Sequence, residues 1–318
     1  NPFDFPLPEN FIVKELVWPL SFFWTQLRLA WEMSFNSPDA LLIPVHILPF
    51  FHPRNSVVTI HGLEYEYFPK YYSFWHRRHL RWSTKSSLKR AKSVIAVSKN
   101  TRFDLIRTYG GDAHRIRTVY HGAGSDRPAF NFRIGGTSGP SLTPYLLFVG
   151  RIEEKKNIAG ILNAYKILKE RYKIPHELVL AGSPGYGFEN LRLQMADGKS
   201  QIKLKGYVNE REKGLLYANA DMFLFPSFYE GFGLPVLEAQ SAGVPVVTSF
   251  DSCLPEIAGE GALFVDPEKP AQIAQAIKTL IDDKTLRDKL IESGYENLKR
   301  FSWEKCARQT LAVLLNKS

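Results

Sequence analysis

The stretch that most constrains this chain runs from Phe225 to Ser249, where a strand, a loop, a helix and a second strand follow one another closely. The apolar residues that end at Phe225 predict a buried strand. Gly231 and Gly233 predict a loop, and Pro235 has the fixed φ that suits a first helical position. Unpaired amides at the start of such a helix, together with the helix dipole, favour a bound phosphate.

Two glutamates flank this loop. Glu230 falls in the loop and Glu238 on the expected helix, so their carboxylates can reach different parts of one ligand. An ionised carboxylate only accepts hydrogen bonds and can therefore bind sugar hydroxyls. From the pattern alone, an ordinary strand, loop and helix with solvated acids is the alternative interpretation.

The chain is long enough for two domains. It has 318 residues, of which 44% are hydrophobic, and a net charge of +9. This charge favours anionic partners such as nucleotide-sugars, acidic lipid surfaces or nucleic acid. The sequence contains no recognised nucleic-acid motif, so we expect no nucleic acid partner. Cys253 and Cys306 are far apart, which indicates neither a disulfide framework nor a metal site and is typical of a reducing compartment.

The N-terminal region shows no membrane helix. The chain begins at Asn1 without a signal-peptide pattern, and we interpret this start as incomplete. The most apolar candidate, residues 11–35, is interrupted by charged residues and is not suited to span a bilayer. Its aromatic side chains, among them Trp18, Phe22 and Trp31, are expected to pack against a sheet from one helical face.

Four strands are expected in the first half of the chain. Residues 40–45 and 56–60 are short apolar runs typical of parallel strands, and 93–97 and 116–120 predict two more. The second of these runs ends at His61. Ligands bind at the carboxyl ends of parallel strands, so His61 is a candidate site residue.

A helix is expected over residues 70–92, and it carries a basic stripe. Four of its cations recur at spacings of three and four, which places them on one face: Arg78, Arg81, Lys85 and Lys89. Trp75 and Trp82 lie among them. The combination is compatible with contact to an anionic membrane or a lipid phosphate, and a solvated helix face is the alternative.

Residues 133–144 are rich in Gly, Pro and Ser and predict a linker. We therefore expect a first domain over 1–138, a second over 139–300 and a C-terminal helix over 301–318. In the second domain strands alternate with helical segments, which predicts a doubly wound parallel sheet. Its expected strands are 145–149, 177–181, 202–208, 222–225, 244–248 and 262–265.

Several blocks of the chain resemble the retaining family-four glycosyltransferases of the GT-B fold. The segment Glu230-Gly-Phe-Gly-Leu-Pro-Val-Leu-Glu238 is similar to their paired-glutamate signature. Further blocks match at fitting spacing: Gly150-Arg151, Lys156-Asn157, Gly206-Tyr207-Val208, Leu254-Pro255-Glu256 and Phe264-Val265-Asp266-Pro267. Among these enzymes the chain is most similar to bacterial mannosyltransferases that build polysaccharides. In two places it departs from the family pattern, at His61-Gly62 and at His121-Gly122.

The resemblance implies an α/β protein in which two Rossmann-like, doubly wound domains face a cleft. It also implies that the last helix crosses back onto the first domain, and that this domain lacks its initial strand and glycine-rich loop. Arg151 and Lys156 would bind the donor diphosphate, Glu230 and His61 the donor sugar, and Glu238 the ribose. The other implied nucleotide-sugar contacts are Gly206, Tyr207, Val208, Gly231, Phe232, Gly233 and Leu234.

The implied reaction is transfer of a hexose, with mannose expected, from a nucleotide-sugar to a glycan or lipid-linked acceptor. GDP-mannose is the expected donor, and neither a cofactor nor a metal is expected. The expected location is the cytoplasm, with peripheral contact at the inner membrane face. A nucleotide-sugar epimerase or sugar phosphorylase of the same fold is one alternative, and a non-catalytic glycan- or nucleic-acid-binding module is another.

Overall fold

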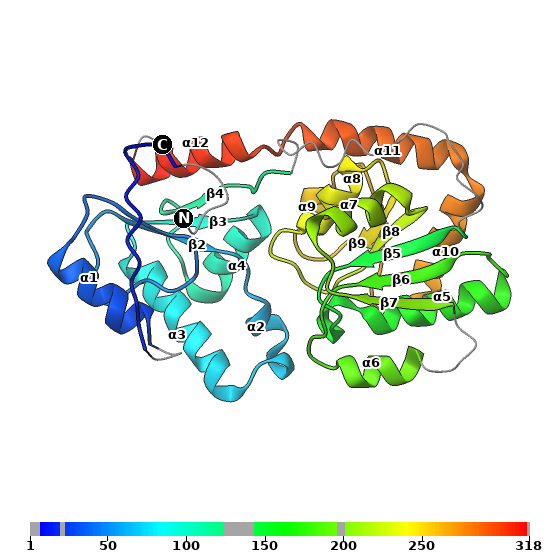
Figure 1. Cartoon of the computed structure of the whole chain (residues 1–318), viewed down its shortest axis with the longest axis horizontal. Helices are drawn as coiled ribbons and strands as arrows, with labels where there is room; N and C mark the ends of the chain where they lie inside the picture. The colour runs from blue at the N-terminus through cyan, green and yellow to red at the C-terminus, as the bar shows by residue number, and fades with distance from the viewer. Residues whose placement is uncertain (1–6, 20–22, 124–142, 196–200, 317–318) are drawn as a thin grey trace.

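Two parallel sheets, each covered by helices, form the two halves of the molecule (Figure 1). The computed structural model describes residues 7–19, 23–123, 143–195 and 201–316. The predicted linker, 133–144, and the boundary between 138 and 139 lie outside these ranges, apart from residues 143 and 144. The two sheets flank that segment in the sequence.

The first sheet has four parallel strands in the order β1-β2-β3-β4. Every residue of β2 is buried, which explains why its sequence after Ser56 is apolar or β-branched rather than alternating. All four strands were expected from the sequence, and each lies within the predicted range. Their bounds are β1 Leu41–Ile43, β2 Ser56–Ile60, β3 Ser93–Ala96 and β4 Ile116–Thr118.

The second sheet has six strands in the order β10-β9-β8-β5-β6-β7. Its first strand, β5, lies in the middle between β6 and β8, so the strand order reverses there. This is the predicted doubly wound arrangement, and its ligand-binding crevice lies at the carboxyl ends of the strands beside that reversal. The strands are β5 Tyr145–Val149, β6 Glu177–Ala181, β7 Ile202–Gly206, β8 Met222–Phe225, β9 Val246–Ser249 and β10 Leu263–Val265.

Helices surround the first sheet. The helix predicted over 70–92 is α3, Phe74–Arg90, and it begins where the Ser73 hydroxyl accepts a hydrogen bond from the His76 amide. The other helical segments described here are η1 Thr25–Leu29, α1 Ala30–Phe35, α2 Glu64–Tyr67, η2 Pro69–Tyr71 and α4 Lys99–Tyr109.

Helices of the second half cover both faces of the larger sheet. The helix of the constraining stretch, α8, spans Leu234–Ser241, and its Pro235 occupies the second helical position. The other helical segments are η4 Glu154–Lys156, α5 Ile158–Arg171, α6 Phe188–Met195, α7 Glu210–Asn219, α9 Leu254–Ala258, α10 Pro270–Asp282, α11 Lys284–Leu298 and α12 Trp303–Leu314.

The C-terminal helix α12 returns to the first sheet (Figure 1). Val313 of α12 is buried in a cluster with Val57 and Ile95 of the first sheet. The Asn55 amide donates a hydrogen bond of 2.9 Å to the Leu314 carbonyl. The last helix therefore connects the two halves of the molecule through packed contacts as well as through the chain.

The prediction that aromatic residues of 11–35 pack on a sheet is wrong for Trp31. Its side chain is 66% exposed. The face that α1 turns inward carries Ala30 and Glu32, and the Glu32 carboxylate pairs with Lys14 and Arg28. Trp18 is half-buried outside any helix, and Phe22 lies outside the described residues.

Candidate active site

The loop after β5 brings two cations to the edge of the second sheet. Arg151 follows β5 after one residue, Gly150, and is exposed. Its guanidinium forms no ion pair or hydrogen bond with any residue that the structure describes. Lys156 ends η4, and its Nζ lies 2.5 Å from Oε1 of Glu230. The two side chains are only 16% and 12% exposed, so this ion pair is largely protected from water. Two predicted site residues are thus in direct contact.

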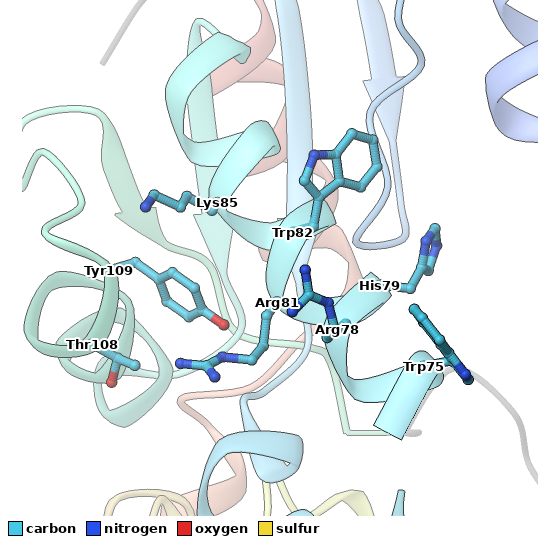
Figure 2. Close-up of a pocket in the computed structure, with 8 residues that line it drawn as sticks. All are labelled: Trp75, Arg78, His79, Arg81, Trp82, Lys85, Thr108 and Tyr109. Atoms are coloured by element: carbon cyan, nitrogen blue, oxygen red, sulfur yellow. The ribbon is translucent and has the colours of Figure 1, made fainter. Parts of the chain in front are cut away.

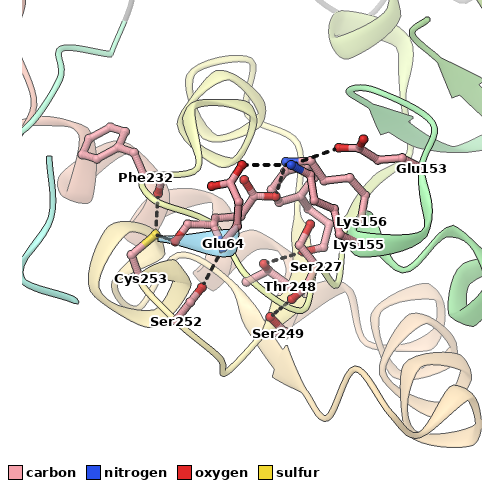
Figure 3. A network of polar contacts seen from close by, with 12 residues as sticks. Glu64, Glu153, Lys155, Lys156, Ser227, Phe232, Thr248, Ser249, Ser252 and Cys253 are labelled. Carbon is pink, nitrogen blue, oxygen red and sulfur yellow. Dashed lines mark hydrogen bonds and ion pairs between the residues drawn. The ribbon is translucent and has the colours of Figure 1, made fainter. Parts of the chain in front are cut away.

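The end of β9 and the residues after it support the loop that carries Glu230 (Figure 3). The Glu230 amide donates to the Ser252 hydroxyl over 3.0 Å, and the Cys253 thiol donates to the carbonyls of Glu230 and Phe232, each over 3.1 Å. Burial, reinforced by the nearby Glu230 charge, raises the pKa of the Cys253 thiol well above its usual range. Cys253 therefore acts as a hydrogen-bond donor that holds the loop.

Glu238 lies on α8 and has different partners from Glu230. Its carboxylate accepts from Lys213 Nζ over 2.8 Å and from the Tyr217 hydroxyl over 3.1 Å. Burial acts to lower the pKa of Lys213, but the Glu238 carboxylate outweighs it and raises that pKa. Each of the two predicted glutamates therefore forms an ion pair with a different lysine, Glu230 with Lys156 and Glu238 with Lys213.

The same loop touches the first domain at Gly231. A Cβ atom at this position would lie 1.5 Å from the His61 carbonyl oxygen, so only glycine fits. Gly231 also accepts a hydrogen bond of 3.3 Å from the Thr101 hydroxyl of α4. Two residues later Gly233 has φ 98°, the left-handed conformation that begins α8. The carboxyl end of β2 and the start of α8 therefore face each other directly.

His61 lies in a row of three imidazoles. Its ring stacks on His46 at 5.7 Å and on His121 at 5.5 Å between centroids. Its Nε2 lies 2.7 Å from the Pro44 carbonyl, which only accepts, so this nitrogen carries a proton, and in the neutral ring Nδ1 is an acceptor. His46 Nε2 in turn accepts from the His61 amide over 2.9 Å.

Burial, followed by the His61 charge, lowers the pKa of both His46 and His121 to about 4, so both rings are neutral near pH 7. Within the part of the chain that the structure describes, no three His, Cys, Asp or Glu side chains are grouped so that they could hold a metal ion.

Comparisons with known proteins identify the family of this chain. Residues 139–297 match the family model described as glycosyl transferases group 1, and residues 7–127 match the model of glycosyltransferase family 4. The O-antigen chain mannosyltransferase B of Escherichia coli is 35% identical over 290 residues, which cover 89% of this chain and 76% of that protein. This chain is a family-four glycosyltransferase.

Solved structures agree with its GT-B fold. WaaG, a glycosyltransferase involved in lipopolysaccharide biosynthesis, aligns with a TM-score of 0.72 at 16% identity over 90% of this chain and 80% of WaaG. HepE of Anabaena, solved in complex with UDP-glucose, aligns with a TM-score of 0.67 at 19% identity over 82% of this chain and 72% of HepE. The predicted fold class, with two α/β domains built on parallel sheets, is confirmed.

The predicted base-binding residues of this glycosyltransferase lie farther along the second sheet. Gly206 ends β7, and its carbonyl accepts from the Gly182 amide over 2.7 Å. Tyr207 is 80% exposed and Val208 is half-buried, both beyond the strand that was expected to reach 208. Strands β5 and β6 separate β7 from β8, so these residues do not adjoin Glu230.

An ion pair between the domains was not foreseen from the sequence. Lys155 Nζ lies 2.9 Å from Oε1 of Glu64 in the first domain and 3.4 Å from Oε1 of Glu153 (Figure 3). Burial acts to lower the pKa of Lys155, but the two carboxylates outweigh it and raise the pKa above its usual range. The neighbouring residues Lys155 and Lys156 therefore pair with different carboxylates, Glu64 and Glu230. The two consecutive lysines were the sequence signal that could have indicated a second ion pair here.

The basic stripe on α3 borders an open groove of about 690 Å³ (Figure 2). Trp75 is 76% exposed at one end, whereas Arg81 pairs with Glu66 over 2.9 Å. Lys89 is not among the residues that line the groove: Trp75, Arg78, His79, Arg81, Trp82, Lys85, Thr108 and Tyr109. In the described ranges, no helix is long and apolar enough to cross a membrane.

Proposed function

We propose that this glycosyltransferase transfers a mannosyl group from GDP-mannose to a glycan or lipid-linked acceptor, with retention of the anomeric configuration. The observation that carries this proposal is the largely buried Lys156–Glu230 ion pair beside the first turn of α8. The 35% identity to an O-antigen mannosyltransferase supports mannose as the sugar. HepE of Anabaena was solved with UDP-glucose, so UDP and UDP-glucose are the competing ligands in the tests below.

The donor diphosphate would lie at the start of α8. Backbone amides there lack partners within the helix and attract anions, as does the helix dipole. Arg151, which is exposed and unpaired among the described residues, and Lys156 would supply the positive charge. Glu238, oriented by Lys213 and Tyr217, would accept hydrogen bonds from the ribose hydroxyls.

Glu230 and His61 would bind the donor sugar. The Glu230 carboxylate has lone pairs beyond the one that Lys156 uses, and they can accept from sugar hydroxyls. The His61 Nδ1 is an acceptor and lies on a residue that is packed against Gly231. We assign base contacts to Gly206, Tyr207 and Val208, of which Tyr207 is exposed and the other two are half-buried.

The reaction that we propose breaks the bond between the sugar anomeric carbon and the diphosphate oxygen. The acceptor hydroxyl oxygen forms the new bond on the same face, and its proton goes to the departing phosphate oxygen, which leaves GDP. No side-chain base and no metal is required in this scheme. Arg151, Lys156 and the α8 amides stabilise the charge that develops on the leaving group.

Nucleotide binding tests the site. Calorimetry with GDP and UDP on the parent chain and on Arg151→Ala should show tighter binding of GDP, and a loss in the variant of about 1.5 to 3 kcal/mol, typical of a hydrogen bond to a charged group. Arg192→Ala removes an exposed arginine on α6 and is the matched control. Equal GDP affinity in Arg151→Ala and the parent would place the diphosphate elsewhere.

Product analysis tests the reaction itself. GDP-mannose and UDP-glucose are each incubated with the enzyme and a mannose-containing acceptor, and the products are separated. We expect a mannosylated acceptor and GDP, with the α configuration preserved. Release of a sugar phosphate, or conversion of the donor into an epimer, would contradict a transferase.

We also propose that the basic stripe on α3 contacts an anionic membrane surface. Arg78, Lys85 and Lys89 form no ion pairs with described carboxylates, and the exposed Trp75 ring beside them is suited to an interface. Co-sedimentation with phosphatidylglycerol vesicles should fall in the double variant Arg78→Glu, Lys85→Glu. The double variant Lys284→Glu, Lys289→Glu on α11, where both side chains are exposed, changes the net charge equally and is the control. Equal sedimentation of both variants would contradict the contact.

A further inference from the structure

The loop after β6 contains three glycines and lies at the carboxyl edge of the second sheet. It spans residues 182–187, with the sequence Gly-Ser-Pro-Gly-Tyr-Gly. Its neighbour at that edge is the segment 150–154 after β5, which carries Arg151. Strands β5 and β6 pair in parallel along their whole length (Figure 1). The 182–187 loop and the 150–154 segment therefore leave adjacent strands in the same direction.

Backbone hydrogen bonds continue the strand pairing into these two segments. One of them satisfies the first amide of η4, a helical turn that has no side-chain cap and that ends at Lys156. The bonds are 2.9 to 3.1 Å long and run from amide to carbonyl: Gly150 to Ala181, Ile152 to Ser183, Gly185 to Ile152 and Glu154 to Tyr186. The path of residues 150–154 is thus set by the 182–187 loop.

Glycines let this loop lie directly on the 150–154 segment. A Cβ atom at Gly182 would overlap the Gly150 carbonyl oxygen. A Cβ atom at Gly185 would lie 2.7 Å from Cγ of Arg151 and 2.7 Å from Cβ of Glu153, closer than side chains approach each other. Gly185 does not have a positive φ. The contact, and not the backbone conformation, therefore requires glycine at position 185.

The same contact sets the direction of Arg151. Its guanidinium has no hydrogen bond or ion pair with a described residue, so polar partners do not orient this side chain. Its stem lies on Gly185 instead, because Cγ of Arg151 is the atom that a side chain at 185 would meet first. The stem is fixed while the guanidinium stays free for a ligand. A catalytic charge needs such placement, since its effect depends on where it is held.

The 182–187 loop is anchored independently of Arg151. On one side, the Gly182 amide donates to the Gly206 carbonyl at the end of β7 over 2.7 Å. On the side of the first domain, the Tyr186 ring lies 5.1 Å from the Tyr71 ring between centroids. The loop is therefore held between β7 and η2 and can support a neighbouring segment.

We propose that the 182–187 loop is a positioning element of the transferase, which fixes residues 150–154 and directs the Arg151 side chain towards the donor diphosphate. The inference rests on the proposed function and adds to it residues that act through Arg151 without contacting the donor. Gly185 is the position at which this support can be disturbed without removing a charge or a hydrogen-bonding group.

Hydrogen exchange tests the support without any ligand. In Gly185→Ala the added methyl group must displace the residues that it meets, so the amides of Ile152 and Glu154 should exchange about tenfold faster or more than in the parent chain. The control is Gly110→Ala at the end of α4, where φ is 65° and a methyl group would meet open space. It lowers stability without touching the loop. Unchanged exchange at both amides in Gly185→Ala would overturn the proposal.

A double-mutant cycle tests whether the loop acts through Arg151. Calorimetry measures the GDP affinity of the parent chain, Gly185→Ala, Arg151→Ala and the double variant. Gly185→Ala should weaken binding by about tenfold in the parent chain and by less than about twofold in Arg151→Ala, because a positioning residue has no effect once its target is gone. Gly110→Ala should bind GDP like the parent chain. Equal weakening on both backgrounds, or none in the parent chain, would overturn the proposal.

A second variant covers the case in which Gly185→Ala does not fold. Pro184→Gly adds no atom and loosens the loop by increasing its backbone freedom. It should give the same faster exchange and the same Arg151-dependent loss of GDP affinity, and the same contrary results would overturn the proposal.

Failure of the proposed function gives a different result. If the parent chain binds neither GDP nor UDP, the proposed donor site is wrong. The exchange comparison then decides the inference alone, because it reports on residues 150–154 without a ligand: faster exchange in Gly185→Ala supports the positioning role of the loop, and unchanged exchange overturns it.

Discussion

Glu230 is held by contacts on both its side chain and its backbone, yet its carboxylate keeps lone pairs that no described group uses. Replacement by glutamine keeps the shape of the side chain and removes its charge. We expect Glu230→Gln to retain the fold and to lower transfer by about 10² or more, since contacts that strengthen in the transition state have effects of that size. Steady-state kinetics and circular dichroism measure the two quantities.

The matched control for this prediction is Glu189→Gln, which changes a glutamate that is 73% exposed on α6. It should turn over like the parent. A folded Glu230→Gln enzyme with the same turnover as this control would mean that Glu230 serves only as the structural partner of Lys156.

At the scale of elements, the second domain holds the N-terminus of α4 in the first domain through direct hydrogen bonds. Glu256 of α9 accepts from the amides of Lys99 and Asn100 over 2.7 and 3.1 Å, and from the Tyr120 hydroxyl over 2.7 Å. A carboxylate at a helix N-terminus satisfies free amides and interacts favourably with the helix dipole. One residue of a second-domain motif therefore caps a first-domain helix.

We expect Glu256→Ala to destabilise the protein by about 0.5 to 2 kcal/mol, the usual effect of losing a helix cap. Hydrogen exchange should rise at the first amides of α4 and stay unchanged in α5, which begins with its own Asn157 cap. Glu260→Ala, an exposed acid that follows the same α9, is the control. Unaltered exchange at Lys99 and Asn100 would show that this contact does not hold α4.

At the scale of the whole molecule, the imidazole row links both domains and the last helix. His121 contacts Phe232 of the second domain at 4.9 Å and Trp303 of α12 at 5.8 Å between ring centroids. His46 and His121 have pKa values of about 4 in the folded protein, against an ordinary 6.5. Between these values the unfolded chain binds protons that the folded chain does not.

The free energy of unfolding should therefore fall as the pH drops from 6.5 towards 4, with each ring contributing a slope of up to about 1.4 kcal/mol per pH unit. Near pH 7 and above, both rings are neutral in both states and contribute no slope. Urea unfolding at pH 7.5, 6 and 5 measures the effect. His121→Asn should flatten this pH profile of the free energy of unfolding. The control His114→Asn, at an exposed histidine, should leave the profile unchanged. Identical profiles in His121→Asn and the parent chain would contradict the assignment to His121.

Much of the fold follows from local patterns. Buried parallel strands are largely apolar or β-branched, so β2, β5, β6 and β8 could be located from the sequence to the residue at which each one begins and ends. The loop and helix after β8 followed from two glycines and a proline. The family was expected from the resemblance of several motifs, and of the spacing between them, to known glycosyltransferases.

The sequence by itself therefore determined the elements, their order along the chain and the family. Only the tertiary structure decided which groups are partners: Lys156 with Glu230, Lys155 with Glu64, and His61 with His46 and His121. The physical reason is the short stretch of sequence over which an apolar pattern carries information. Apolar periodicity reports the burial of a residue within its own element, whereas these partners are brought together by sheet order and by the docking of two domains. Lys155 and Glu64 lie 91 positions apart, and no local pattern extends so far.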